Sequence, residues 1–121
     1  MQVERLKVQP AIFLNFEWRY NLSMEYVFSW DTNKANINLK KHKISFEEAK
    51  TIFNDPFLLT LPDEEHSETE ERFISIGTST KERILLVVHL EKHETENKSF
   101  VRIISCRKAT PIERRKYEEK E

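Results

Sequence analysis

The sequence predicts an α+β domain in which two helices precede an antiparallel sheet of about four strands and a further helix closes the chain. Three observations favour this class. Helix-cap signals stand at Asp31, Ser45 and Thr110, an uninterrupted apolar run covers 84–90, and further short strand-like runs lie between 57 and 107. A chain of 121 residues can bury one modest core.

The first predicted strand covers Tyr26–Trp30, where aromatic and smaller residues alternate. Asp31 can then cap a helix that runs to Lys41. Its inward positions follow helical spacing: Ala35, Asn38 or Leu39, and His42.

A second helix begins at a capping box, in which the Ser45 hydroxyl accepts from the Glu48 amide and the Glu48 carboxylate reaches back to Ser45. The helix ends before Asn54-Asp55-Pro56, since the residue before a proline disfavours helical geometry. Its apolar face consists of Phe46, Ala49, Ile52 and Phe53.

Four strands are predicted next, over 57–61, 72–76, 84–90 and 100–107. The run 84–90 is apolar throughout, which is typical of a central strand buried on both faces.

The loops and turns between these elements are predicted from polar runs and from proline and glycine. Pro62 and the acidic run to Glu70 form a polar loop, and Gly77, the only glycine, forms a turn. The charged segment Glu91–Asn97 forms a hairpin loop. The closing helix begins with Thr110-Pro111-Ile112-Glu113, which places a cap, a first-turn proline and a box glutamate in order, and it runs to about Lys120.

Charge is segregated along the chain although the net charge is only −1. From Asp55 to Arg72 there are seven acidic residues against one basic residue, and from Lys98 to Glu121 there are eight basic residues against four acidic ones. The basic segment favours an anionic partner, and the alternative is that both segments are solvated faces of ordinary elements.

Cys106 lies in an apolar run and has no second cysteine to pair with, so it is expected to serve packing in a reducing compartment. No run approaches the length of a membrane span.

Two blocks carry a resemblance to a known family: Trp30-Asp31-Thr32-Asn33-Lys34-Ala35 with Lys41-His42, and residues 101–109 with Glu113-Arg114 and Tyr117. Together they resemble the BrnT family, the toxin half of a bacterial type II toxin–antitoxin pair, over roughly Glu25 to Glu121. The resemblance implies a RelE-like fold and a small metal-independent ribonuclease that needs no cofactor. Ser29 and Cys106 depart from the family pattern.

Residues 1–24 lie outside this pattern, and Met24-Glu25-Tyr26 looks like the beginning of a typical member. They are either a start assigned too far upstream or a real extension, while residues 25–121 form the toxin domain. We predict that residues 1–24 can be removed without loss of folding, and that a chain starting at Met24 melts cooperatively. Precipitation of that truncated chain, or a melt without cooperativity, would contradict the prediction.

RNA cleavage without a metal needs a base for the 2′-hydroxyl proton, cations for the charge on the phosphorane and an acid for the leaving 5′-oxygen. The resemblance implies that lysines and arginines supply the cations. The candidate catalytic residues are Arg72, Arg102, His89 and Arg107, and the candidate RNA-binding residues are Lys41, His42, Lys108 and Tyr117. His89 and His93 stand four apart but straddle a strand end, so no metal site is expected.

Each catalytic candidate has a structural alternative. Arg72 is either a phosphate clamp or a strand-edge arginine paired with a loop acid. Arg102 lies in an apolar strand, where an unpaired charge is costly, so it points into a polar cleft or is held in a salt bridge. His89 is a general acid or base by its ordinary pKa, or a partly buried histidine bonded to a neighbour. Because side chains alternate along a strand, Arg102 and Arg107 can share a site only if the strand bends or bulges near Ser105.

The RNA-binding candidates have alternatives too. Lys41 lies at the end of a helix, where the dipole alone explains a cation, while His42 has a possible direct role. Tyr117 can stack on a base or pack in the core, and the same holds for Trp30.

The resemblance implies a cytoplasmic endoribonuclease toxin that arrests translation and growth and is neutralised by a BrnA-like antitoxin with a ribbon-helix-helix part, in a heterotetramer. Operator DNA is expected to be contacted only through the antitoxin, because the chain has no helix-turn-helix signature and no overall basic charge. The alternative is a non-catalytic binding module that acts as co-repressor with its antitoxin.

Overall fold

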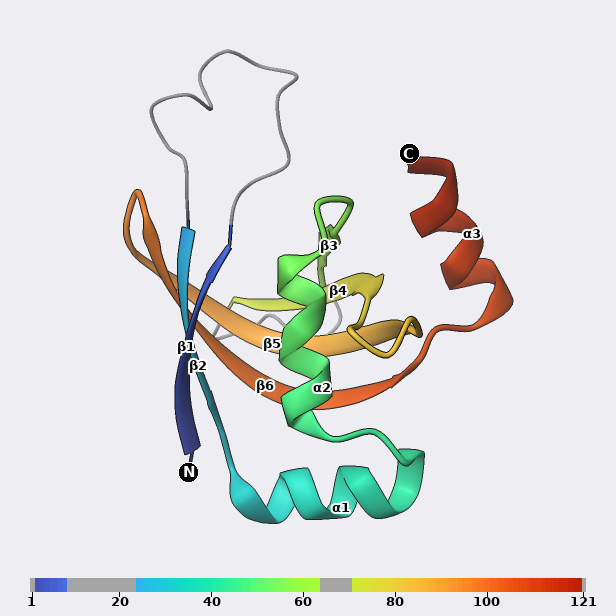
Figure 1. The fold of residues 1–121 in the computed structure, drawn as a ribbon, viewed down its shortest axis with the longest axis horizontal. Coiled ribbons are helices and arrows are strands. Elements are labelled where there is room, and N and C mark those ends of the chain that lie inside the picture. The colour runs from blue at the N-terminus through green and yellow to red at the C-terminus, as the bar shows by residue number, and fades with distance from the viewer. Residues whose placement is uncertain (1, 9–23, 64–70, 121) are drawn as a thin grey trace.

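The computed structural model describes residues 2–8, 24–63 and 71–120, and within them six strands form one sheet in the order β1-β2-β6-β5-β4-β3 (Figure 1). The strands are β1 Gln2–Val8, β2 Met24–Trp30, β3 Leu59–Pro62, β4 Arg72–Thr78, β5 Ile84–Thr95 and β6 Lys98–Lys108. The helices are α1 Thr32–His42, α2 Phe46–Lys50 with the 3-10 turn η2 Thr51–Asn54, and α3 Pro111–Lys120.

The predicted α+β class and the order of its helices are confirmed, and the sheet is mixed where it was predicted to be antiparallel. β2 pairs with β6 in parallel, while the other neighbouring strands pair antiparallel. The reason lies in the connection between them. The chain leaves β2 through α1 and α2 and builds β3, β4 and β5 before β6 returns beside β2, and a parallel pair requires a long crossover of this kind.

β1 pairs along the whole length of β2, with Gln2 opposite Trp30 and Val8 opposite Met24. The backbone of β2 is therefore covered on the side away from β6. Without β1, β2 would become an edge strand with unpaired backbone groups. That residues 1–24 are dispensable for folding stays a prediction.

Helices pack on both faces of the sheet. We call the side covered by α1 and α2 the inner face and the side on which α3 packs the outer face. The inner core contains the predicted apolar residues of the second helix together with residues of β2, β5 and β6 and with Ile44 from the connection between α1 and α2: Phe28, Trp30, Ile44, Phe46, Ala49, Ile52, Phe53, Leu85, Val87, Val101, Ile103 and Cys106. The outer core is smaller and contains Ile76, Leu86 and Tyr117. Because β5 contributes buried residues to both cores, it is the predicted central strand.

α1 closes the sheet through a polar side chain. β2 ends opposite Ile103, so the edge of β6 beyond this point has no strand beside it. Asn38 takes that place: its Nδ2 donates to the carbonyl oxygens of Cys106 and Ile44 at 2.9 and 3.0 Å, and its Oδ1 accepts from the Cys106 amide at 3.0 Å. Asn38 is therefore the buried residue of the helix, while Leu39 is exposed.

Two of the predicted helix caps are confirmed and one is half right. Asp31 accepts from the first-turn amides, and Thr110 and Glu113 form a complete capping box. Ser45 accepts from the Glu48 amide at 3.0 Å as predicted. The Glu48 carboxylate, however, turns to Ser79 and Arg83, because a buried carboxylate is better satisfied by a guanidinium than by one amide.

Two predicted loops are wrong. Gly77 lies inside β4, where a Cβ would come within 3.0 Å of Leu58 Cδ1 and 3.1 Å of Ile52 Cβ, so the glycine allows η2 and the segment after it to approach the strand. The segment Glu91–Asn97 is mostly strand, because β5 continues to Thr95 and β6 begins at Lys98.

Candidate functional site

A bulge in β6 determines which way its arginines point. The residues on either side of Ile104 pair with consecutive residues of β5, so Ile104 is an extra residue in the strand. Past the bulge the alternation is shifted by one residue. Arg102 lies opposite Leu90 and Arg107 opposite Leu86, and both leucines belong to the outer side of β5. Arg102 and Arg107 therefore share the outer face. Their alternation along the strand required a bend or bulge near Ser105 for this, and the bulge at Ile104 supplies it.

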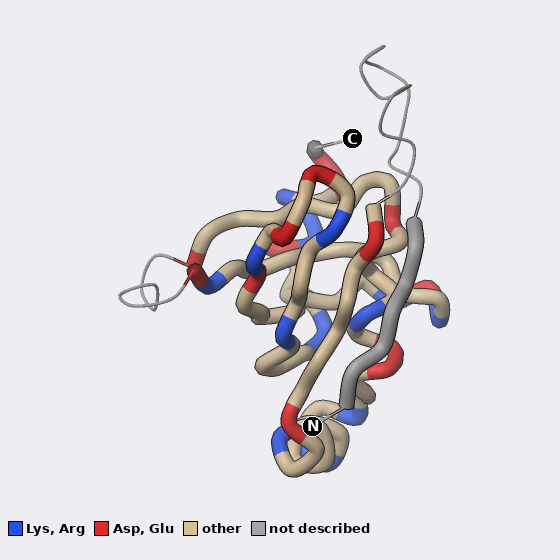
Figure 2. Tube along the Cα trace, turned by 90° about the vertical axis from the view of Figure 1, so that its left-hand side faces the viewer, with Lys and Arg blue, Asp and Glu red and all other residues tan. Residues whose placement is uncertain are grey.

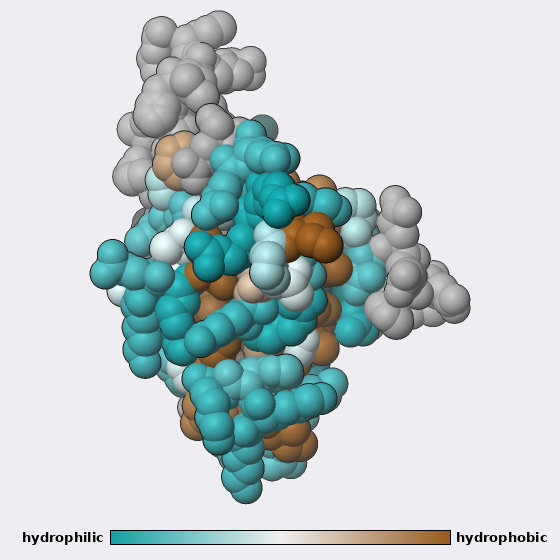
Figure 3. Space-filling model, turned by 90° about the vertical axis from the view of Figure 1, so that its right-hand side faces the viewer, coloured by the Kyte–Doolittle hydropathy of each residue, from teal (hydrophilic) through white to brown (hydrophobic). Residues whose placement is uncertain are grey.

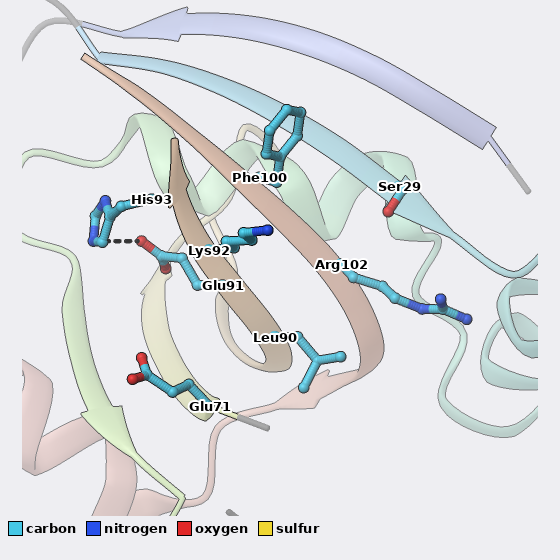
Figure 4. A pocket seen from close by; sticks show the side chains of 8 residues that line it. All are labelled: Ser29, Glu71, Leu90, Glu91, Lys92, His93, Phe100 and Arg102. Atoms are coloured by element: carbon cyan, nitrogen blue, oxygen red, sulfur yellow. Dashed lines mark ion pairs between the residues drawn. The ribbon is translucent and has the colours of Figure 1, made fainter. Parts of the chain in front are cut away.

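Arg102 lines a pocket of about 620 Å³ (Figure 4). The pocket is bounded by Ser29, Glu71, Leu90, Glu91, Lys92, His93, Phe100 and Arg102. Within the part of the chain that the structure describes, Arg102 has no ion-pair partner. The geometry thus favours the polar cleft over the salt bridge for this arginine, and the pocket offers its guanidinium to an anion.

Glu91 and His93 belong to the other side of the strand. Figure 4 shows both side chains leaving β5 away from Leu90 and Arg102, as the alternation of a strand requires. Glu91 Oε2 lies 3.7 Å from His93 Nε2 and accepts from Ser99 Oγ at 3.2 Å. Burial raises the pKa of Glu91. The pocket lining therefore combines two cations, Arg102 and Lys92, with the acidic Glu71 and Glu91.

Arg72 stands on the outer face, directly across Leu90 from Arg102. Two strand spacings separate the two arginine backbones by roughly 10 Å. Arg72 Nε lies 3.5 Å from Asp63 Oδ2, and Arg72 is not among the residues lining the pocket. The pairing with a loop acid matches the structural alternative for Arg72, while its position leaves it beside the candidate site.

His89 is buried on the inner face, opposite in direction to Arg102. Its Nε2 lies 2.7 Å from Ser75 Oγ, and its ring stacks on Phe73 and meets the edge of Phe53. Burial lowers its pKa to about 4. A ring that is 0% exposed cannot reach a substrate on the outer face, so the geometry favours the structural alternative for His89.

The buried imidazole makes folding sensitive to acid. The folded-state pKa of His89 is about 4, below the ordinary 6.5 that the unfolded chain keeps, so the unfolded state binds the proton first as the pH falls. We expect this group to remove about 3 kcal/mol from the free energy of unfolding between pH 6.5 and pH 4, with no further loss below that range. Urea titrations across this range measure the effect.

The matched comparison is His89→Phe, which keeps an aromatic ring and has no titrating proton. Its free energy of unfolding should change less between pH 6.5 and 4 than that of the unaltered protein. Glu91 Oε1 lies 3.8 Å from His89 Nδ1, so the comparison measures the imidazole together with its effect on the Glu91 carboxyl, whose pKa is raised by burial. Parallel pH profiles would show that the imidazole proton is not responsible.

Arg107 is held by the last helix. Its Nη1 and Nη2 donate to Glu113 Oε1 and Oε2 at 2.8 and 2.9 Å. This pair lowers the pKa of Glu113 to about 2. Arg107 thus anchors the first turn of α3 to the end of β6, which leaves fewer of its N–H groups for a ligand.

Four of the eight candidates meet in a second pocket, of about 500 Å³, at the C-terminal end of α1. We call it the basic pocket. Every residue that lines it except one is a lysine, an arginine or a histidine: Lys41, His42, Lys43, Arg83, Arg107, Lys108 and Thr110. The first pocket and the basic pocket together contain Arg102, Lys41, His42, Arg107 and Lys108, so the structure divides these five candidates between two places.

Tyr117 belongs to the outer core. It is buried, and its hydroxyl donates to Asp55 Oδ2 and lies 3.0 Å from Thr78 Oγ1. The core role therefore explains this tyrosine. Trp30 and Cys106 are likewise buried in the inner core, and burial raises the pKa of the Cys106 thiol to about 12.

Figure 2 shows lysine and arginine positions interspersed with acidic ones, and Figure 3 shows mainly hydrophilic side chains with small hydrophobic patches on the side where α3 lies. Within the described residues, no helix is long and apolar enough to cross a membrane, and no group of three or more potential metal ligands is found.

The sequence did not single out Ser29, Lys92, Lys43 or Arg83, which all line a pocket. Lys43 could have been found from the run Lys41-His42-Lys43. Arg83 gave no signal, because it comes from the turn between β4 and β5 and reaches the pocket only in the folded chain.

The crystal structure of the ribonuclease toxin BrnT of Brucella abortus is similar at 20% identity and a TM-score of 0.49, over 69% of this chain and 95% of that chain. A comparison with curated proteins finds no match. A family model described as "Ribonuclease toxin, BrnT, of type II toxin-antitoxin system" matches residues 30–113. Since this match covers more than half of the chain, the protein belongs to the BrnT family of ribonuclease toxins of type II toxin–antitoxin systems.

Proposed function

We propose that this protein is a metal-independent endoribonuclease whose cleavage site is the pocket that contains Arg102. The observation that carries the proposal is that Arg102 lines an open pocket and has no ion-pair partner among the described residues, while the acidic Glu71 and Glu91 line the same pocket. Lys92 lines the same pocket, and Arg72 stands across Leu90. Cations of this kind are what a phosphodiester needs when its charge grows in the transition state.

The chemistry follows from the 2′-hydroxyl of RNA. Its oxygen attacks the neighbouring phosphorus while its proton passes to a solvent water molecule, the bond from phosphorus to the 5′-oxygen breaks, and the products are a 2′,3′-cyclic phosphate and a 5′-hydroxyl. The planar guanidinium of Arg102 can donate two parallel hydrogen bonds to the phosphorane oxygens. The ammonium of Lys92 can give a proton to the leaving 5′-oxygen. His89 has no part in this scheme because it is buried on the other face.

A partner completes the proposed function. As a toxin of a type II system, the protein is neutralised by a cognate antitoxin, which we propose to be a BrnA-like protein with a ribbon-helix-helix part. We further propose that the two form a heterotetramer in the cytoplasm, that operator DNA is bound only through the antitoxin, and that the free toxin stops translation by cutting RNA. The family description supports an antitoxin partner and the cutting of RNA, and the absence of an overall basic charge supports the indirect contact with DNA.

The test is controlled expression in a bacterium with growth and RNA integrity as the readouts. The full chain should arrest growth and fragment RNA, and the Arg72→Ala, Arg102→Ala double variant should do neither while still binding the antitoxin. Unchanged toxicity of the double variant would leave both arginines structural. Normal growth with a stable, folded wild-type protein would favour the co-repressor module instead.

A further inference from the structure

Lys43 holds a backbone conformation that is unusual for a lysine. It is the residue that ends α1, with φ 62° and ψ 30°, and its amide donates to the Leu39 carbonyl. Helices commonly end in this left-handed geometry, and glycine is the usual residue there because a Cβ disfavours it. The side chain of Lys43 lines the basic pocket. A lysine at this position therefore adds a cation to the pocket at a cost in backbone strain.

The basic pocket has a surplus of positive charge. Its two arginines are paired, Arg83 with the buried Glu48 and Arg107 with Glu113. Its three lysines have no ion-pair partner in the part of the chain that the structure describes: Lys41, Lys43 and Lys108. The surplus cations thus come from the lysines, on two elements that the fold brings together.

The helix dipole accounts for part of this cluster. The C-terminus of a helix carries partial negative charge, so the basic residues in the last turn of α1 stabilise the helix. This local effect does not involve Lys108, which ends β6, and it gives no reason to accept left-handed strain at Lys43 when glycine would avoid it. Binding of a negatively charged ligand explains both the cation at Lys108 and the left-handed lysine at position 43.

We infer that the basic pocket binds a backbone phosphate of single-stranded RNA, away from the scissile phosphate, and that Lys43 contacts it. This rests on the proposed function, because RNA is the ligand. Arg102 and Arg107 lie five residues apart on β6, which is roughly 16 Å along a strand, so one phosphate cannot contact both pockets. The basic pocket would therefore hold the RNA chain where it continues beyond the cleavage site, as basic grooves do for single-stranded nucleic acid.

The experiment compares two residues whose backbone adopts the left-handed conformation, Lys43 and Glu82. Lys43→Gly removes the cation and relieves the strain, and Glu82→Gly relieves the same strain at φ 59°, on a residue that does not line the pocket. Affinity is measured by fluorescence anisotropy with a 2′-O-methyl RNA of about 12 nucleotides, which cannot be cleaved because its nucleophile is blocked. Melting temperature is measured in parallel.

Lys43→Gly should raise the melting temperature by about 2–4 °C, yet weaken RNA binding roughly threefold to tenfold and reduce the salt slope by about 0.7. Glu82→Gly should raise the melting temperature similarly without weakening RNA binding. Lys43→Asn, which tolerates the left-handed geometry, should weaken binding as the glycine does. Unchanged affinity and salt slope in both Lys43 variants would overturn the inference, as would equal losses of affinity in Lys43→Gly and Glu82→Gly.

The two proposals can fail separately. If the wild-type protein cleaves no RNA but binds the 2′-O-methyl RNA through Lys43, the cleavage function fails and the phosphate site stands. If the wild-type protein cleaves RNA and both Lys43 variants bind as tightly as it does, the phosphate site fails alone. Weaker binding of the antitoxin, and not of RNA, in the Lys43 variants would assign the pocket to the protein partner and overturn the inference.

Discussion

On the proposed function, replacing Arg102 with alanine should lower the rate constant of RNA cleavage by about 10²–10³-fold, the usual effect of removing one donor that stabilises a transition-state charge. The effect is large because Arg102 lines the pocket and has no ion-pair partner within the described residues, so its charge is available to the substrate. Arg72→Ala should cost less, since Asp63 already shares its charge. The fold should be unaffected in both variants.

The measurement is single-turnover cleavage of a labelled RNA oligonucleotide, with circular dichroism and melting temperature as checks on folding. Arg102→Lys should recover part of the rate, because the charge remains while the two-pronged geometry is lost. Arg114→Ala is the control, since that arginine pairs with Glu118 on its own helix. A full rate in the Arg102→Ala protein would remove this pocket from the mechanism.

Replacing Asn38 with leucine lowers the free energy of unfolding by about 3 kcal/mol or more. Leucine has a similar size but makes none of the three hydrogen bonds to the Cys106 amide and to the carbonyls of Cys106 and Ile44. Each buried group left without a partner costs about 1–3 kcal/mol. Because β6 also positions Arg102, the edge next to α1 should become the first part of the sheet to open.

Urea unfolding followed by circular dichroism measures this loss, and hydrogen exchange at Cys106 locates it. Asn36→Leu is the matched control, since Asn36 is exposed on the same helix and its replacement should stay within about 0.5 kcal/mol. A small loss in Asn38→Leu, equal to that of the control, would mean that water or a shifted strand satisfies the Cys106 backbone.

The sequence predicted well where the signal is local. The caps at Asp31, Ser45 and Thr110 act within one turn, so their residues suffice to place the starts of α1, α2 and α3. The apolar run 84–90 could be assigned to the centre of the sheet because every position must be buried there. Gly77 was misassigned because the reason for its glycine is a neighbour that comes from elsewhere in the chain.

The sequence could predict which residue types the candidate site contains, but it could not predict where in the fold these residues lie or which of them lie together. Five basic residues that line the two pockets belong to the blocks of the family resemblance: Lys41, His42, Arg102, Arg107 and Lys108. The face to which Arg102 and Arg107 point, however, depends on a bulge at Ile104 that no local pattern predicts. The same holds for His89: its ordinary pKa made it a candidate, and only packing against Phe53 and Phe73 shows it to be buried. Lys43 became notable only once its backbone angle was known.

By itself, then, the sequence determined the α+β class, the order of the helices and of the strands from β2 to β6, and the chemistry that the chain can offer, because periodicity, capping and charge are properties of neighbouring residues. It did not predict β1. The tertiary structure decided which side chains face the same way, which cations are neutralised and which edge of the sheet Asn38 closes. Those outcomes depend on contacts between residues far apart in the chain, such as Asn38 with Cys106 and Glu48 with Arg83, and only the folded chain brings these residues together.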